Sequence, residues 1–152
     1  MTGGLKTLAG AHGVIACVVL IVWAIAVYSA LRRWKSTLGW NIGAAMGGLI
    51  VFLMGLLLHM PFQSRLRQKL FIKAAAVGWM FERKEHAAFG AVLLSWCAVG
   101  ALWAARSCEG NEKWIAAAGG FYRAGISALA GGFLFYAFAL WAGFNASQYV
   151  GF

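Results

Sequence analysis

The chain has 152 residues, of which 62% are hydrophobic and only 11% are charged, and its mean hydropathy is +0.76. Soluble domains carry about a quarter charged residues, so this composition predicts an integral membrane protein. The formal net charge is +9. Because the basic residues stand at the ends of apolar stretches and in one connection, we expect them to face lipid head groups or an acidic partner. Nucleic acid is not an expected partner.

Four apolar stretches are long enough to cross a bilayer as helices, since each crossing needs about 20 residues. Within a single domain covering 1–152, the expected spans are 8–31, 37–60, 86–105 and 124–143. Four spans place both termini on the same side of the membrane. The cations divide almost equally between the two sides, so the positive-inside rule leaves the orientation open. We expect the bacterial inner membrane or an energy-transducing membrane.

The connection 61–85 between the second and third spans is long and basic. Its apolar residues recur at helical spacing, while its cations lie mostly elsewhere, which predicts an amphipathic helix lying in the membrane interface. Two interpretations stay open: a connector that contacts lipid, or a lid whose cations meet anionic groups of a cofactor or substrate. The expected fold is therefore an all-α, four-transmembrane-helix up-and-down bundle with an amphipathic interfacial helix between the second and third spans.

All three histidines are expected at the side of the membrane that carries the termini. His12 begins the first span and His86 begins the third, and in an up-and-down bundle these two helices are diagonal. At matching depth, the two imidazoles are placed to hold a haem iron from its two sides. Ala16 and Gly90 lie one turn deeper, where a flat macrocycle needs space. The alternative is that each histidine simply ends a helix and hydrogen-bonds at the interface.

His59 lies near the end of the second span, next to a helix-breaking proline. It is expected to contact a haem propionate or a substrate, or to be a plain interfacial residue. Among the cations of the connection, Arg65, Arg67, Lys69 and Lys73 are candidates for neutralising the propionates. The three cysteines have no metal-ligand spacing and are interpreted as packing residues. Because no paired carboxylates lie within the spans, a membrane hydrolase or transporter is poorly supported.

Two motifs resemble the cytochrome b561 family of transmembrane b-type cytochromes. Ala11-His12-Gly13, followed by an apolar helix that ends at Arg32-Arg33, resembles the first core helix of that family. Glu85-His86-Ala87-Ala88-Phe89-Gly90 resembles its third core helix, and the likeness extends over about residues 8–143. The resemblance implies bis-histidine haem b and one-electron exchange with a small reductant such as a quinol or ascorbate.

The sequence departs from this family at the second haem. The family has histidines near the starts of its second and fourth core helices, where this chain reads Leu38-Gly39-Trp40-Asn41 and Phe121-Tyr122-Arg123. The resemblance therefore supports one haem, which cannot by itself relay electrons across the bilayer.

The sequence supports two functional hypotheses. The first is a membrane-bound b-type cytochrome with one haem, its iron held by His12 and His86, that passes electrons to or from a quinone, a small reductant or a partner protein. If the chain is an enzyme, the expected class is an oxidoreductase that works by haem-dependent electron transfer. The alternative is a non-catalytic accessory subunit of a larger respiratory or photosynthetic complex, in which a histidine contacts a pigment. The expected partners are the lipid bilayer, other membrane-protein subunits or an electron-transfer protein, and a homo-oligomer stays open.

Overall fold

The computed structural model describes residues 3–33, 35–65, 67–109 and 112–150. This part of the chain contains no β-strand. Its helices are α1 (Gly3–Leu31), α2 (Thr37–Arg65), α3 (Arg67–Lys73), α4 (Ala75–Cys108), the short 3₁₀ helix η1 (Glu112–Trp114) and α5 (Ile115–Val150). Four of them, α1, α2, α4 and α5, are long and apolar enough to cross a membrane, which confirms the all-α, multi-pass membrane fold.

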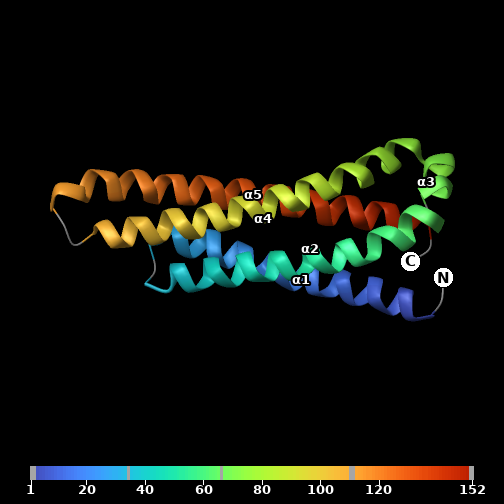
Figure 1. Ribbon diagram of the computed structural model, residues 1–152, viewed down its shortest axis with the longest axis horizontal. Coiled ribbons are helices and arrows are strands. Elements are labelled where there is room, and N and C mark those ends of the chain that lie inside the picture. Colours follow the sequence, from blue (N-terminus) through green and yellow to red (C-terminus); the bar gives the residue numbers. More distant parts are fainter. Residues whose placement is uncertain (1–2, 34, 66, 110–111, 151–152) are drawn as a thin grey trace.

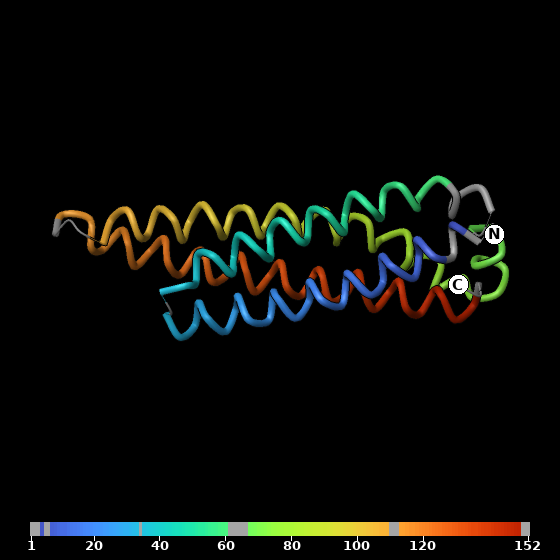
Figure 2. The backbone as a smooth tube through the Cα atoms, turned by 90° about the horizontal axis from the view of Figure 1, so that it is seen from below, coloured from blue at the N-terminus to red at the C-terminus, as the bar shows by residue number. Residues whose placement is uncertain are grey.

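The four long helices form two antiparallel hairpins, α1 with α2 and α4 with α5, packed side by side (Figure 1). The start of α1 and the end of α5 lie at the same end of the bundle, which is also the end that carries α3. At the other end, α4 and α5 continue beyond the α1–α2 hairpin in both views (Figure 2). There the Tyr122 hydroxyl donates to the carbonyl of Ala30, and the Arg106 guanidinium donates to that of Lys35, which ties the two hairpins together.

The two later helices are longer than the sequence pattern predicts. We expected spans of 86–105 and 124–143, whereas α4 begins at Ala75 and α5 begins at Ile115. The polar run 82–86, which interrupts the apolar pattern, lies inside α4. A helix can continue through such residues because its backbone hydrogen bonds do not depend on which side chains it carries.

The connection 61–85 does not form one amphipathic helix. It is divided among the end of α2, the separate short helix α3 and the first turns of α4. The backbone of Ala74, which is not helical (φ −156°, ψ 79°), separates α3 from α4. This bend brings Leu70 of α3, which is fully buried, against Phe81 of α4 and Ala146 of α5. α3 therefore packs on the bundle rather than extending away from it.

The centre of the bundle is built around Trp23 of α1, whose side chain is fully buried. Its ring lies 5.1 Å from the ring of Tyr136 of α5, centroid to centroid. The Tyr136 hydroxyl donates a hydrogen bond of 3.1 Å to the carbonyl of Ala16, so α5 is fastened to α1 at this level. Gly132 permits the close approach of helices here, because a Cβ on it would lie 3.3 Å from the carbonyl oxygen of Ala91.

The outward faces of the helices are apolar, as a lipid environment requires. Large hydrophobic side chains that are more than 60% exposed occur on all four long helices, for example Ile21, Leu57, Trp103 and Leu134. In water such a surface would aggregate, whereas in a bilayer it contacts hydrocarbon.

Candidate functional site

A cavity of about 440 Å³ lies among α1, α2, α4 and α5, near the end of the bundle that carries α3. Sites for small molecules commonly measure about 300–1,000 Å³, so this cavity has the size of a ligand site. Small residues make up much of its wall and create the space: Gly13, Ala16, Gly48, Gly55, Ala88 and Ala139. Polar side chains from all four helices, among them Tyr136 and Ser147 of α5, enter this mostly apolar wall.

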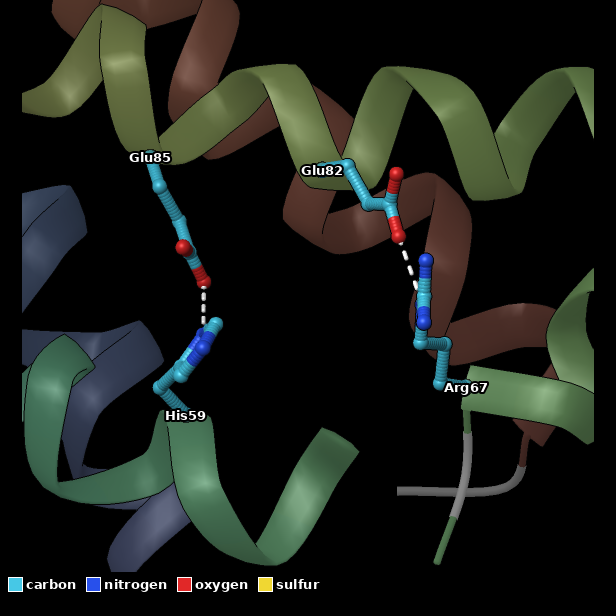
Figure 3. Close-up of polar contacts among 4 residues, drawn as sticks. All are labelled: His59, Arg67, Glu82 and Glu85. Atoms are coloured by element: carbon cyan, nitrogen blue, oxygen red, sulfur yellow. Dashed lines mark hydrogen bonds and ion pairs between the residues drawn. The ribbon is translucent and has the colours of Figure 1, made fainter. Parts of the chain in front are cut away.

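His59 of α2 and Glu85 of α4 both line the cavity, and their side chains point toward each other (Figure 3). The Nδ1–H of His59 donates a hydrogen bond to Oε1 of Glu85. Both side chains are partly buried, with 29% and 34% of their surfaces exposed. A carboxylate at Nδ1 fixes the orientation of the imidazole and leaves Nε2 as its acceptor nitrogen, so the pair is suited to accept and release a proton.

Lys84 is the cation of the cavity. It is partly buried, and its Nζ lies 3.8 Å from the centre of the Phe81 ring, which also lines the cavity. Its charge interacts with the carboxylate of Glu85 and with the imidazole of His12. Within the described part of the chain, the ammonium group makes no hydrogen bond.

His12 of α1 lines the same cavity and is partly buried. Its Nδ1 is fully buried and has no hydrogen-bond partner among the described residues. The edge of the ring lies against α2 at Gly55, where an added Cβ would be 3.6 Å from Cε1 of the imidazole. A buried ring nitrogen without a partner is unfavourable, and in native proteins it is commonly satisfied by a ligand, an ion or water.

His86, the second expected iron ligand, is exposed on α4 and does not appear among the described residues that line the cavity. The residues of α4 that do line it are Phe81, Lys84, Glu85 and Ala88, which share one face at helical spacing. Each residue turns the helix by about 100°, so Lys84 and Glu85 mark the two edges of this face, and His86 lies beyond the edge at Glu85. The structure thus does not bring His12 and His86 together in the cavity, and the two imidazoles that it places there belong to His12 and His59.

The other expected site residues divide in the same way. Ala16 lines the cavity, as expected. Gly90 lies against α5 instead, where an added Cβ would be 3.2 Å from Cδ2 of Phe135. Arg67 forms an exposed ion pair with Glu82, 2.6 Å from Nε to Oε1, away from the His59–Glu85 pair (Figure 3). The side chain of Arg65 lies outside the described residues.

Two polar members of the site, Lys84 and Glu85, were not predicted from the sequence. A signal for them existed, because Phe81, Lys84, Glu85 and Ala88 follow the i, i+3, i+4, i+7 spacing of one helical face. The expected start of the third span at residue 86 concealed this signal by leaving these positions outside the helix.

The donor set limits the chemistry of this cavity. Among the described residues, no three His, Cys, Asp or Glu side chains gather to hold a metal ion by themselves. A haem iron needs only one or two axial ligands from the protein, and a quinone needs only hydrogen-bond donors and a proton acceptor. Comparisons with known proteins do not decide between these ligands, since no protein-family model, no curated protein and no solved structure matches this chain.

Proposed function

We propose that this chain is a membrane redox protein whose cavity binds the head group of a quinone or quinol. The observation that carries the proposal is the His59–Glu85 hydrogen bond in the wall of an otherwise apolar cavity of about 440 Å³. A quinone head group is a flat apolar ring with two carbonyl oxygens. The small residues of the cavity suit the ring, and the imidazole of His59 suits its oxygens. Nε2 accepts from a quinol hydroxyl, and the Nε2–H of the imidazolium donates to a quinone carbonyl.

The His59–Glu85 pair supplies the proton chemistry that a quinol requires. Oxidation of a quinol to a quinone releases two electrons and two protons. Nε2 of His59 accepts a proton from the quinol hydroxyl, while the Glu85 carboxylate at Nδ1 stabilises the imidazolium that forms. The two electrons leave in successive one-electron steps to an external acceptor, such as a partner electron-transfer protein, and the second proton follows through His59 once the imidazolium has released the first. The location of the pair at one end of the bundle favours release of the protons to one side of the membrane.

A binding experiment tests this proposal, with His86→Ala as the matched control. The purified protein is placed in lipid nanodiscs and titrated with decylubiquinone, and binding is followed by quenching of tryptophan fluorescence. We expect saturable binding by the wild type and by His86→Ala, and about tenfold weaker binding by His59→Ala, which removes the imidazole that hydrogen-bonds to the head group. Absence of saturable binding in the wild type, or equal losses in the two variants, would contradict the proposal.

A second candidate is a haem in the same cavity, and the unpartnered, buried Nδ1 of His12 is the observation that favours it. The donors present fit this group in part: His12 and His59 offer imidazoles to an iron, and Lys84 offers a cation to a propionate. When bound, the haem would supply one-electron chemistry. The structure favours His59 over the expected His86 as the partner of His12, because His59 shares the cavity with it.

A reduced-minus-oxidised absorbance spectrum of the purified protein tests the haem candidate. We expect the haem bands to be lost in His12→Ala and His59→Ala and to be retained in His86→Ala. A wild type without haem absorbance would exclude the candidate. Loss of the bands in His86→Ala, together with retention in His59→Ala, would instead restore the ligand pair expected from the sequence.

A further inference from the structure

The cavity contains a cation that the proton chemistry of His59 and Glu85 does not use. Lys84 lines the wall beside Glu85, and its Nζ rests 3.8 Å from the centre of the Phe81 ring. A lysine side chain is usually exposed, and a partly buried one is costly unless an anion or hydrogen-bond acceptors surround it. Here the described residues offer the ammonium an aromatic face, which replaces only part of its hydration.

The nearest anion is already engaged. Glu85 interacts with the charge of Lys84, but its Oε1 accepts the hydrogen bond from His59. On the other side, His12 is close enough to Lys84 for the two to interact electrostatically, and an imidazole supplies no negative charge. The charged groups that face the cavity are therefore Lys84 and one carboxylate that is shared between this lysine and His59. The other titratable side chains there are His12, whose Nδ1 has no partner among the described residues, Cys17 and Tyr136.

We propose that the cavity takes its ligand as an oxygen anion, with the ammonium of Lys84 as the counter-ion. The ligand class is an amphiphile: an apolar body that suits the glycine, alanine and leucine wall, and a head that carries one ionised oxygen. The inference rests on the proposed function only in naming an acidic hydroxyquinone as the preferred member of this class. A neutral quinone would leave the charge of Lys84 with only the shared carboxylate of Glu85, and a cationic ligand would be repelled by it.

Matched pairs of ligands isolate the contribution of the charge. The first pair is an alkyl-substituted hydroxynaphthoquinone, which ionises at its enol oxygen, and the corresponding methyl-substituted naphthoquinone, which has no acidic proton. The second pair is laurate and dodecanol, which are not redox carriers. Binding to the protein in nanodiscs is measured by calorimetry for the wild type, Lys84→Met and Lys84→Arg. Lys69→Met serves as the control, because it removes an exposed cation on α3 instead.

In the wild type we expect the anionic member of each pair to bind about tenfold more tightly than its neutral partner. Lys84→Met is expected to abolish that preference, whereas Lys84→Arg and Lys69→Met are expected to retain it. Lys84→Arg preserves the charge and so guards against loss of the fold as the explanation. A preference that survives in Lys84→Met, or a wild type without any preference, would overturn the inference.

The two pairs also separate this inference from the proposed function. Equal binding of both naphthoquinones by the wild type would leave the quinone site standing and remove the role of Lys84. Binding of laurate that depends on Lys84, without binding of either naphthoquinone, would remove the quinone function and leave the anion site standing. If none of these ligands binds, both proposals are wrong.

Discussion

Glu85 and His86 are consecutive residues of α4 with opposite surroundings: Glu85 lines the cavity and accepts a hydrogen bond from His59, whereas His86 is exposed. A rotation of about 100° between neighbouring residues is sufficient to produce this difference. In this segment the carboxylate of Glu85, rather than the imidazole of His86, therefore belongs to the candidate site.

A double-mutant cycle on His59 and Glu85 measures the energy of that contact. We expect His59→Ala and Glu85→Ala to be less than additive in the free energy of unfolding, with a coupling of about 1 kcal/mol. The value is modest because both side chains are partly exposed and water replaces some of the lost interaction. Reversible unfolding in mixed micelles, followed by circular dichroism, supplies the four free energies. Strict additivity would show that the pair contributes no stability.

Substitution of Gly55 by leucine should close the cavity without unfolding the bundle. An added Cβ at Gly55 meets only the His12 ring, at 3.6 Å, which is an ordinary van der Waals contact, and the remainder of a leucine side chain has the cavity to enter. We expect ligand binding to be lost and the helical content to be retained. Gly39→Leu is the control on the same helix, because a Cβ there meets nothing within 4 Å in the described structure. Undiminished binding in Gly55→Leu would place the ligand elsewhere.

Two glycines of α5 should respond in opposite directions to substitution by alanine. At Gly125 an added Cβ would lie 2.8 Å from Cγ of Leu102, so we expect Gly125→Ala to destabilise the protein by about 1–3 kcal/mol through overpacking. At Gly120 nothing lies within 4 Å in the described structure, so Gly120→Ala should stabilise it by up to about 1 kcal/mol through higher helix propensity. Thermal unfolding in detergent compares the two variants. Equal melting temperatures would argue against close packing of α4 on α5.

Removal of the Tyr136 hydroxyl should weaken the contact between α5 and α1. This hydroxyl donates to the carbonyl of Ala16, and the side chain is buried, so we expect Tyr136→Phe to lose about 1 kcal/mol of unfolding free energy. Tyr149→Phe, at an exposed position near the end of α5, is the control and should leave stability unchanged. The comparison uses denaturant titration of both variants under the same conditions. A larger loss in Tyr149→Phe would contradict the packing described here.

Arg67 should be dispensable for the ligand site. Its ion pair with Glu82 is exposed, and exposed pairs contribute about 0–1 kcal/mol. We therefore expect Arg67→Ala to retain both the fold and the affinity for every ligand that the wild type binds. Calorimetry with the same set of ligands checks this expectation. A marked loss of affinity would revive the role in propionate binding that the sequence suggested for this residue.

The fold was predictable because hydropathy alone marks spans such as Thr37–Met60, whose length and apolar content leave few alternatives. The start of α4 was not, since residues 82–86 are polar and hydropathy cannot distinguish a polar loop from a polar turn of helix that faces a cavity. The rotation of α4 was equally inaccessible. It depends on packing between distant segments, such as Phe81 on Leu70 and Ala146, and this packing decides that Glu85 rather than His86 faces inward.

The bend at Ala74 has a mechanical consequence. It seats Leu70 on Phe81, and the ring of Phe81 in turn supports the ammonium of Lys84 in the cavity wall. One aromatic ring thus serves two contacts, one with the short helix at the end of the bundle and one with the charge of the site. A displacement of α3 against α4 must move that ring, so an event at the end of the bundle has a direct, three-residue linkage to the ligand.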